Sequence, residues 1–241
     1  MPKRKSHREK PKSVFCETAA AGKHICLSRS KVFFDFDNTI TSFDVLDDII
    51  KRFSMNEEWV VIEEKWREGK IGSRECLKGQ MNLVRITKPN LLTYLSKIEV
   101  DAYFPKLLKL LKRRQVPIAI VSDSFSFIIN YILDKNGIDG IDVYSNRLTF
   151  DRDKFRVMFP HANKQCFKCA NCKRAHIFNH GRSEKFTIYI GDGFSDICPA
   201  THADLVFAKG NLLDHFKRID RVHVPFEHLG TVYNYLKSMD S

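Results

Sequence analysis

Short apolar runs alternate with amphipathic stretches from residue 31 to the end of the chain. The apolar runs are nearly continuous, as expected of strands covered on both faces, and lie at 31–35, 117–122, 187–192, 204–208 and 221–225. Between them, apolar residues recur at helical spacing in the stretches 45–53, 104–114, 125–137 and 229–239. This alternation predicts an α/β fold with a doubly wound parallel sheet.

Two segments depart from the alternation. Between the first and second predicted strands the pattern indicates only helices, and this is too much chain for a single crossover. We therefore expect an all-helical cap at 43–105, inserted into a catalytic core made of 31–42 and 106–241. At 143–159, two β-rich runs flank Asp151-Arg152-Asp153, which is a pattern typical of an antiparallel β-hairpin.

Positive charge is concentrated at the N-terminus. The formal net charge is +11; residues 1–30 hold eight Lys/Arg against two Asp/Glu, so +6 lies there and +5 in the other 211 residues. This stretch has little to bury and predicts a basic, disordered extension at 1–30. The alternative is a basic arm that binds polyanions.

The hydropathy of the chain argues against a membrane protein and a secreted one. No eighteen apolar residues run together, so we expect no membrane-spanning helix. The apolar stretch near the N-terminus is too short and too broken for a signal-peptide core. Without such a signal, the seven cysteines do not indicate a disulfide framework, and we expect a reducing, cytoplasmic location.

The first predicted strand ends in two carboxylates. In VFFDFDNTIT (32–41), Asp35 closes the strand, and Asp37 follows at the period that returns a side chain to the same face. Other polar candidates also stand at or just after strand ends, with a lysine between them in sequence: Ser122, Lys173, Asp192 and Asp196. The carboxyl ends of parallel strands form the ligand-binding edge of an open sheet, so we expect these side chains to meet there.

Such a set suits the chemistry of a phosphate ester. The transferred phosphoryl group needs fixed positive charge and hydrogen-bond donors around its oxygens. Magnesium prefers oxygen ligands, typically one or two carboxylates with substrate phosphate and water. One carboxylate can attack phosphorus while a second protonates the leaving oxygen.

The motifs DFDNTIT, IVSDS and GDGFSD, with a lysine between the last two, resemble the four motifs of the haloacid dehalogenase (HAD) superfamily of phosphohydrolases over roughly residues 31–241. The resemblance implies that Asp35 is the nucleophile. It also implies that Asp37 is the acid/base that protonates the leaving group and then activates water. Ser122 would hold a phosphoryl oxygen, and Lys173 would neutralise the phosphate and the nucleophile.

The same resemblance implies a magnesium site. Its ligands would be Asp35, the backbone carbonyl of Asp37, and Asp192, with Asp196 supporting them. It further places Thr39 near the nucleophile and adds Asp123, beside the motif serine, to the substrate-binding set.

The helical insertion resembles that of the phosphoserine-phosphatase-like branch. Matching GKIGSRECLKGQM (69–81) to the cap stretch that binds the serine moiety places Arg74 and Gln80 at the ligand positions, so both usual ligands are absent. A match shifted by one residue would bring Glu75 into play. The chain is more similar to the subgroup of the methylthiopentenyl-phosphate phosphatases of methionine salvage and to phosphoethanolamine/phosphocholine phosphatases.

A cysteine-rich segment precedes the motif lysine. In PHANKQCFKCANCK (160–173), Cys166, Cys169 and Cys172 are spaced C-x2-C-x2-C and follow His161. Three thiolates and one imidazole would complete a tetrahedral structural zinc site that stiffens the loop carrying the lysine. The alternatives are a loop with free thiols and an iron–sulfur cluster, which lacks a fourth thiolate close by.

Two classes of function remain open. The first is a magnesium-dependent phosphomonoesterase that acts on a small phosphorylated metabolite. The second is a basic, zinc-containing nucleic-acid-binding protein. The second is disfavoured because the basic tail has a single aromatic residue, Phe15, and because strand-end acids would repel phosphate unless a cation intervened. Neither the physiological substrate nor the oligomeric state follows from the sequence.

Overall fold

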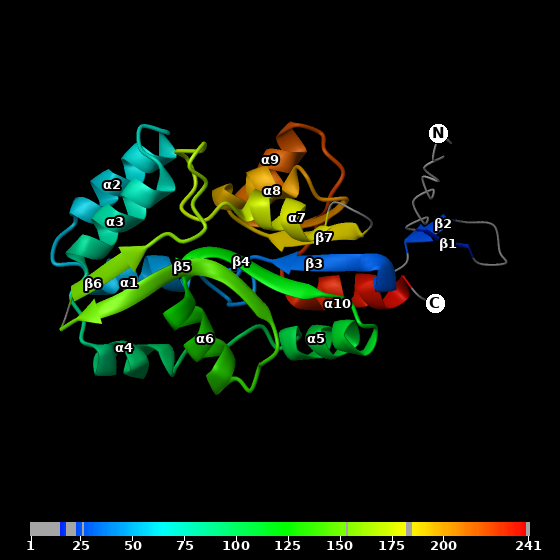
Figure 1. Ribbon diagram of the computed structural model, residues 1–241, viewed down its shortest axis with the longest axis horizontal. Coiled ribbons are helices and arrows are strands. Elements are labelled where there is room, and N and C mark those ends of the chain that lie inside the picture. Colours follow the sequence, from blue (N-terminus) through cyan, green and yellow to red (C-terminus); the bar gives the residue numbers. More distant parts are fainter. Residues whose placement is uncertain (1–14, 18–22, 26, 153, 182–184, 240–241) are drawn as a thin grey trace, which may run out of the picture.

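The computed structural model describes residues 15–17, 23–25, 27–152, 154–181 and 185–239. A seven-stranded sheet in the order β6-β5-β4-β3-β7-β8-β9 forms its centre (Figure 1). The strands are β3 (Ser30–Phe34), β4 (Ile118–Phe125), β5 (Asp142–Asp151), β6 (Lys154–Met158), β7 (Phe186–Gly191), β8 (Leu205–Ala208) and β9 (Val224–Pro225). All neighbouring pairs run parallel except β5 and β6. The predicted α/β fold with a parallel sheet is confirmed.

Alternate residues of each central strand enter two separate cores. Val32 and Phe34 of β3 belong to one cluster of buried residues and Phe33 to the other, because successive strand side chains point to opposite faces. The first core is covered by α5 (Phe104–Arg113), α6 (Ser126–Lys135) and α10 (Leu229–Ser238). The second is covered by α7 (Lys173–Gly181), α8 (Ile197–Ala200) and α9 (Gly210–Arg218), on the opposite face of the sheet (Figure 1).

The segment between β3 and β4 is helical before α5, as expected. It contains α1 (Val45–Phe53), α2 (Glu58–Arg67), α3 (Ser73–Leu83) and α4 (Lys88–Leu95). The chain leaves and rejoins the core at one place, since the amide of Asp101 donates to the carbonyl of Ile40 at 2.8 Å. Helices α2 and α3 lie side by side, whereas α4 lies against the core helix α6 (Figure 1). The proposed cap limits of 43–105 stay a prediction.

Two predicted strands differ in length from the observed ones. The strand predicted at 117–122 continues to Phe125, which pairs with Asn146 of β5 after a shift of register. The strand predicted at 221–225 is reduced to Val224–Pro225 at the edge of the sheet. A proline at this place has no N–H to extend the ladder, which is why such residues are confined to edges and strand ends.

The expected hairpin at 143–159 is present as β5 and β6, which pair from Asp151↔Lys154 to Arg147↔Met158. In the predicted N-terminal extension, residues 1–14, 18–22 and 26 lie outside the described residues. The described part pairs β1 (Phe15–Glu17) with β2 (Lys23–Ile25), and the 3-10 turn η1 (Leu27–Arg29) leads into β3. None of the helices described here has the length and apolarity that crossing a bilayer requires.

Candidate active site

The two acids of the first motif are held by backbone groups at the carboxyl end of β3. The amide of Asp35 donates to the carbonyl of Ile190 at 2.9 Å, so its backbone continues the ladder between β3 and β7. The chain then turns sharply, with Asn38 at a φ of 50°. Past this turn, one carboxylate oxygen of Asp37 accepts the amides of Val45 and Leu46 at 3.0 and 3.3 Å. The start of α1 therefore fixes Asp37 beside Asp35.

Lys173 joins the fourth motif to the first. Lys173 is the first residue of α7 and is only 2% exposed to solvent. Its Nζ lies 2.6 Å from a carboxylate oxygen of Asp35 and 2.7 Å from one of Asp196. Its third hydrogen bond goes to the hydroxyl of Ser195 at 2.9 Å. All three protons of the ammonium group are engaged, so the lysine is held rigidly under the nucleophile.

Asp196 is a buried hub rather than a group facing the pocket. Its Oδ1 accepts both the ammonium of Lys173 and the hydroxyl of Tyr189, the latter at 2.6 Å. Its Oδ2 accepts the backbone amides of Asp192 and Gly193 at 3.0 and 2.9 Å. With both oxygens occupied, Asp196 shapes the GDGFSD loop and orients the lysine.

Three carboxylates converge at the strand ends. One oxygen from each of Asp35, Asp192 and Asp196 lies within 4.8 Å of the others, and among the described residues no cysteine or histidine joins a group of this kind. The two oxygens of Asp192 accept from Asn38 Nδ2 at 2.7 Å and from Thr39 Oγ1 at 3.3 Å. These three carboxylates carry more negative charge than the single ammonium group of Lys173 can balance. Their oxygens are the kind of ligand that magnesium prefers, so the cluster fits a magnesium ion.

The surroundings shift the pKa values of these acids upward. Burial, the charge of Asp196 and the charge of Asp192 raise the pKa of Asp35 well above its usual range, while Lys173 opposes the rise. Burial and Asp196 raise the pKa of Asp192 to about 6. Burial also raises the pKa of Asp37 to about 6. Burial alone would lower the pKa of Lys173, but the carboxylates of Asp196 and Asp35 raise it well above normal.

The second motif is tied to the cysteine-rich loop. The Ser122 hydroxyl accepts the amide of Ser124 at 2.9 Å, which leaves its own proton free to donate into the pocket. Asp123 also lines the pocket, and one of its carboxylate oxygens accepts the amide of Asn171 at 3.0 Å. The Asn171 side chain donates to the carbonyls of Ser122 and Tyr144. This asparagine stands two residues before Lys173, so it sets the position of the lysine against β4.

A cavity of about 180 Å³ opens over these groups. Its base comprises Asp35, Asp37, Ser122, Lys173 and Asp192. Its walls come from the start of α1, from α2 and α3, and from the GDGFSD loop, and include Asp44, Asp47, Glu63, Trp66, Arg67, Ser73, Cys76, Leu77, Gln80 and Phe194. Glu63 accepts from Arg67 at 3.0 Å and from Gln80 at 3.1 Å, which links the two helices over the site.

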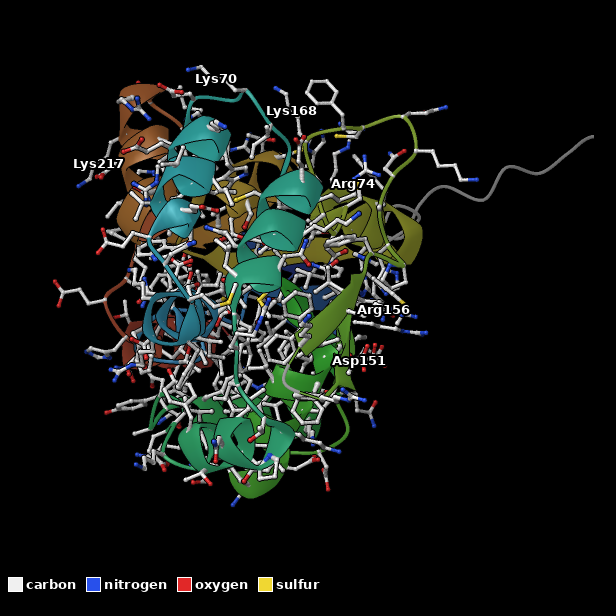
Figure 2. All side chains as sticks on the ribbon, turned by 90° about the vertical axis from the view of Figure 1, so that its left-hand side faces the viewer. Lys70, Arg74, Asp151, Arg156, Lys168 and Lys217 are labelled. Carbon is white, nitrogen blue, oxygen red and sulfur yellow. The ribbon has the colours of Figure 1, made fainter. Side chains whose placement is uncertain are left out.

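The structure separates the two predicted cap ligands. Gln80 lines the cavity, but Arg74 does not. The guanidinium group of Arg74 donates to the backbone carbonyl of Cys166 at 3.1 Å. Figure 2 shows Arg74 beside the loop that carries Lys168. The prediction that Arg74 binds substrate is therefore not supported by the geometry, because its side chain is used to hold this loop on α3.

The cysteine-rich loop does not gather the four predicted zinc ligands. The Sγ atoms of Cys166 and Cys169 lie 4.0 Å apart, yet within the described part of the chain the cysteines and His161 form no group of donor atoms within 4.8 Å. The His161 ring instead packs edge-on against Tyr144 and His176. Zinc at this loop stays a prediction.

Several contributors to the site were not predicted from the sequence. Asn38 and Ser195 sit inside recognised motifs, where their polar side chains were an available signal. Tyr189 lies in a continuous apolar run and looks like a core residue, although its hydroxyl binds Asp196. The cap residues that form the cavity walls carried no such signal, because a helix pattern does not show which positions face a neighbouring domain.

Comparison with known proteins agrees with this geometry. The model of the family described as "Putative Phosphatase" matches residues 30–217. The chain belongs to this family. With the HAD motifs and fold, this makes the protein a phosphoric monoester hydrolase that acts on a small phosphorylated metabolite. The resemblance to the HAD superfamily drawn from the motifs is confirmed.

Relatives of this phosphatase cover most of its length. It is 29% identical to a 2-hydroxy-3-keto-5-methylthiopentenyl-1-phosphate phosphatase of Bacillus pumilus over 80% of this chain and 84% of the relative. It is 27% identical to the protein of the same name from Geobacillus thermodenitrificans, over 87% and 96%. A substrate-bound phosphoserine phosphatase structure superposes with a TM-score of 0.66 at 21% identity, over 86% and 98%; at this identity the likeness shows the fold.

Proposed function

We propose that the protein hydrolyses its phosphomonoester through a phosphoaspartate at Asp35, with magnesium bound at the strand ends. The observation that carries the proposal is the buried contact of 2.6 Å between Lys173 Nζ and Asp35 at the base of the cavity. Burial raises the pKa of Asp35, and the ammonium group of Lys173 opposes this rise, so the lysine favours the ionised form that attacks phosphorus. Asp37, beside it, supplies the second carboxylate that a two-step displacement needs.

In the first step a carboxylate oxygen of Asp35 bonds to phosphorus as the bond from phosphorus to the ester oxygen breaks. Asp37 gives its proton to that leaving oxygen, so an alcohol departs. A pKa of about 6 leaves part of Asp37 protonated near neutral pH, as this role requires. In the second step Asp37 takes a proton from water as the water oxygen attacks phosphorus, and Asp35 and inorganic phosphate are released.

Magnesium would be held by Asp35 and Asp192, the two carboxylates of the cluster that line the cavity. When bound, the ion supplies positive charge that neutralises the phosphoryl oxygens. Asn38 and Thr39 orient Asp192 by hydrogen bonds to its two oxygens. Asp196, with its oxygens engaged by four donors, would support the site without facing the ion.

For the substrate, we propose a methylthiopentenyl phosphate as the first candidate, supported by the names of the relatives. The cavity wall has an apolar side that suits a methylthio group, formed by Trp66, Leu77 and Phe194. The rings of Trp66 and Phe194 meet edge to face with centroids 6.3 Å apart.

A second candidate is a phosphate ester of an amino alcohol, and the charge of the wall favours it. Asp44 and Asp47 line the cavity and form no ion pair in the part of the chain that the structure describes, whereas Glu63 is paired with Arg67. An ammonium group on the substrate would find carboxylates and a tryptophan face there. Phosphoserine is less well suited, because Arg74 lies away from the cavity.

The test is a panel of the methylthiopentenyl phosphate, phosphoethanolamine, phosphocholine and phosphoserine, each assayed by phosphate release with magnesium and with chelator. We expect turnover only with magnesium. The variant Asp47→Asn should have a lower kcat/KM for the amino-alcohol esters. Its kcat/KM for the methylthiopentenyl phosphate, which has no ammonium group, should be unchanged. If no member of the panel and no chromogenic aryl phosphate is hydrolysed, the proposed function is wrong.

A further inference from the structure

A buried hydroxyl beside the catalytic acids has no partner. Among the described residues, three buried side-chain polar atoms lack a hydrogen bond, namely Ser54 Oγ, Ser124 Oγ and Asn146 Oδ1. Of these three, Ser124 alone lines the cavity, and its residue is 2% exposed. A buried hydroxyl without a partner is costly to the folded protein. Its place in the cavity wall suggests that a bound molecule provides the partner.

The backbone fixes where this hydroxyl stands. The amide of Ser124 donates to Ser122 Oγ at 2.9 Å, and Phe125 pairs with Asn146 of β5. Ser124 is therefore clamped on both sides within β4. Asn146 Nδ2 donates a hydrogen bond to the backbone carbonyl of Asp123, the residue before Ser124, at 2.6 Å. These contacts fix the backbone from which the Ser124 side chain projects beside the cavity.

Ser124 stands next to the group that would protonate the leaving oxygen. Its hydroxyl is close enough to Asp37 to lower the pKa of that carboxyl, but the two groups do not reach hydrogen-bonding geometry. One oxygen of Asp37 is already shared by the amides of Val45 and Leu46. In the proposed reaction Asp37 protonates the leaving oxygen, so the Ser124 hydroxyl near Asp37 is available to the leaving group. Lys173 and Ser122 serve the phosphoryl group in the same scheme.

We propose that Ser124 is a substrate-binding residue that hydrogen-bonds a polar atom of the leaving group on the carbon next to the ester carbon. The substrate class this implies is a phosphate ester with a hydroxyl, carbonyl or amine at that position. The inference rests on the proposed function, because it takes the orientation of the ester from the roles of Asp35 and Asp37. Plain alkyl esters would leave the hydroxyl buried and unpaired.

Two isosteric esters test this directly. 2-Hydroxyethyl phosphate and propyl phosphate differ by a hydroxyl in place of a methyl group at the position in question. Each is used as a competitor of 4-nitrophenyl phosphate hydrolysis in the magnesium-loaded enzyme. We expect the wild type to bind the hydroxyethyl ester about three- to tenfold more tightly, the range that one hydrogen bond supplies. Ser124→Ala should abolish this preference and Ser124→Thr should retain it.

Two further readouts separate substrate binding from a structural role. The inhibition constant of inorganic phosphate should stay within about twofold in Ser124→Ala, because the phosphoryl contacts are unchanged. The melting temperature should stay close to that of the wild type, because the substitution breaks no formed hydrogen bond of the Ser124 hydroxyl. The matched control is Ser54→Ala, another buried and unpaired serine hydroxyl that lies outside the cavity; it should keep the preference.

The outcomes are distinct. A wild type without the preference, or a Ser124→Ala variant that keeps it, would overturn the role of Ser124 while leaving the proposed function intact. Equal loss of affinity for inorganic phosphate would also overturn it, because the hydroxyl would then serve the phosphoryl group. A wild type that fails to hydrolyse 4-nitrophenyl phosphate with magnesium would refute the proposed function instead.

Discussion

Replacing Asp192 with asparagine should make the metal-free enzyme more stable and abolish its response to magnesium. In the absence of a cation, Asp192 is held near Asp35 and Asp196, and burial with the charge of Asp196 raises its pKa from 3.8 to about 6. At pH values above both pKa values, this rise means that the ionised carboxylate of Asp192 destabilises the folded state by about 3 kcal/mol. Asparagine removes this charge with little change of shape.

The gain is partly offset by lost hydrogen bonds. Asp192 accepts from Asn38 and Thr39, and weakening these two contacts costs about 1 kcal/mol each. The net expectation at pH 7.5 is a stabilisation of about 1 kcal/mol, and hence a melting temperature higher by about 2–4 °C for a chain of this size.

The sign of the pH dependence is also fixed. Near pH 4 the carboxyl is largely neutral in the folded state, so the advantage of the variant should be small there. It should grow as the pH rises towards 6 and stay constant above it, because only the wild type then carries the unfavourable charge.

The assay is thermal unfolding in chelator and in magnesium, with phosphatase activity measured alongside. The wild type should gain stability from magnesium, by about 2.7 kcal/mol at a concentration one hundred times the Kd. The variant should gain little and should be inactive. A variant that is less stable than wild type in chelator at pH 7.5, or one that gains as much from magnesium, would refute the reasoning about this carboxylate cluster.

The remaining predictions concern the nucleophile, the lysine and the cysteines. Asp35→Asn should abolish turnover while the protein still melts cooperatively, and beryllium fluoride with magnesium should give an adduct in the wild type only; more than a few percent of residual activity would exclude Asp35. Lys173→Met should lose activity and about 3–5 kcal/mol of stability, because it leaves buried carboxylates unpaired; a variant that melts like wild type would contradict this. Elemental analysis tests the zinc prediction. About one equivalent of zinc and a destabilised Cys169→Ser variant would support it, whereas metal-free protein with an active variant would count against it.

The core could be predicted because its signals are local. Strands buried on both faces are continuous apolar runs, and polar residues at their carboxyl ends mark the binding edge whatever the rest of the chain does. That rule predicts that Asp35 and Asp192 meet at one edge, as they do in the structure. Lys173 begins a helix, and only the resemblance to the HAD motifs gives it a role beside Asp35. The roles of Asn38 and Ser195 depend on which neighbour a turn residue happens to meet, and sequence spacing does not give that contact.

The cap could not be predicted in the same way. The periodicity of apolar residues predicts its helices. Which residues face the cavity depends on how α2 and α3 pack over the strand ends, and periodicity does not show this. Gln80 lines the cavity whereas Arg74 contacts the cysteine-rich loop, although both lie on α3 and both were predicted at substrate-binding positions. Fewer than two turns of helix separate the residue in the cavity wall from the residue on the cysteine-rich loop.

That loop explains why the cap and the catalytic lysine are not independent. The start of α3 is fastened to it by Ser73, whose amide donates to the carbonyl of Lys168 at 2.8 Å, and by Arg74. The contact is so close at Gly72 that any side chain would run into the carbonyl of Phe167. Ser73 is also part of the cavity wall, where its hydroxyl accepts from the Trp66 indole at 3.0 Å.

The other end of the same loop continues into the base of the cavity. The amide of Cys172 donates to the carbonyl of His161 at 3.0 Å, and the amide of Asn171 donates to Asp123. Lys173 follows directly and reaches Asp35 and Asp196. A single loop therefore sets both the wall that contacts the leaving group and the cation that holds the nucleophile. Because the loop couples the two, a change in the cap that displaces it should alter kcat as well as KM.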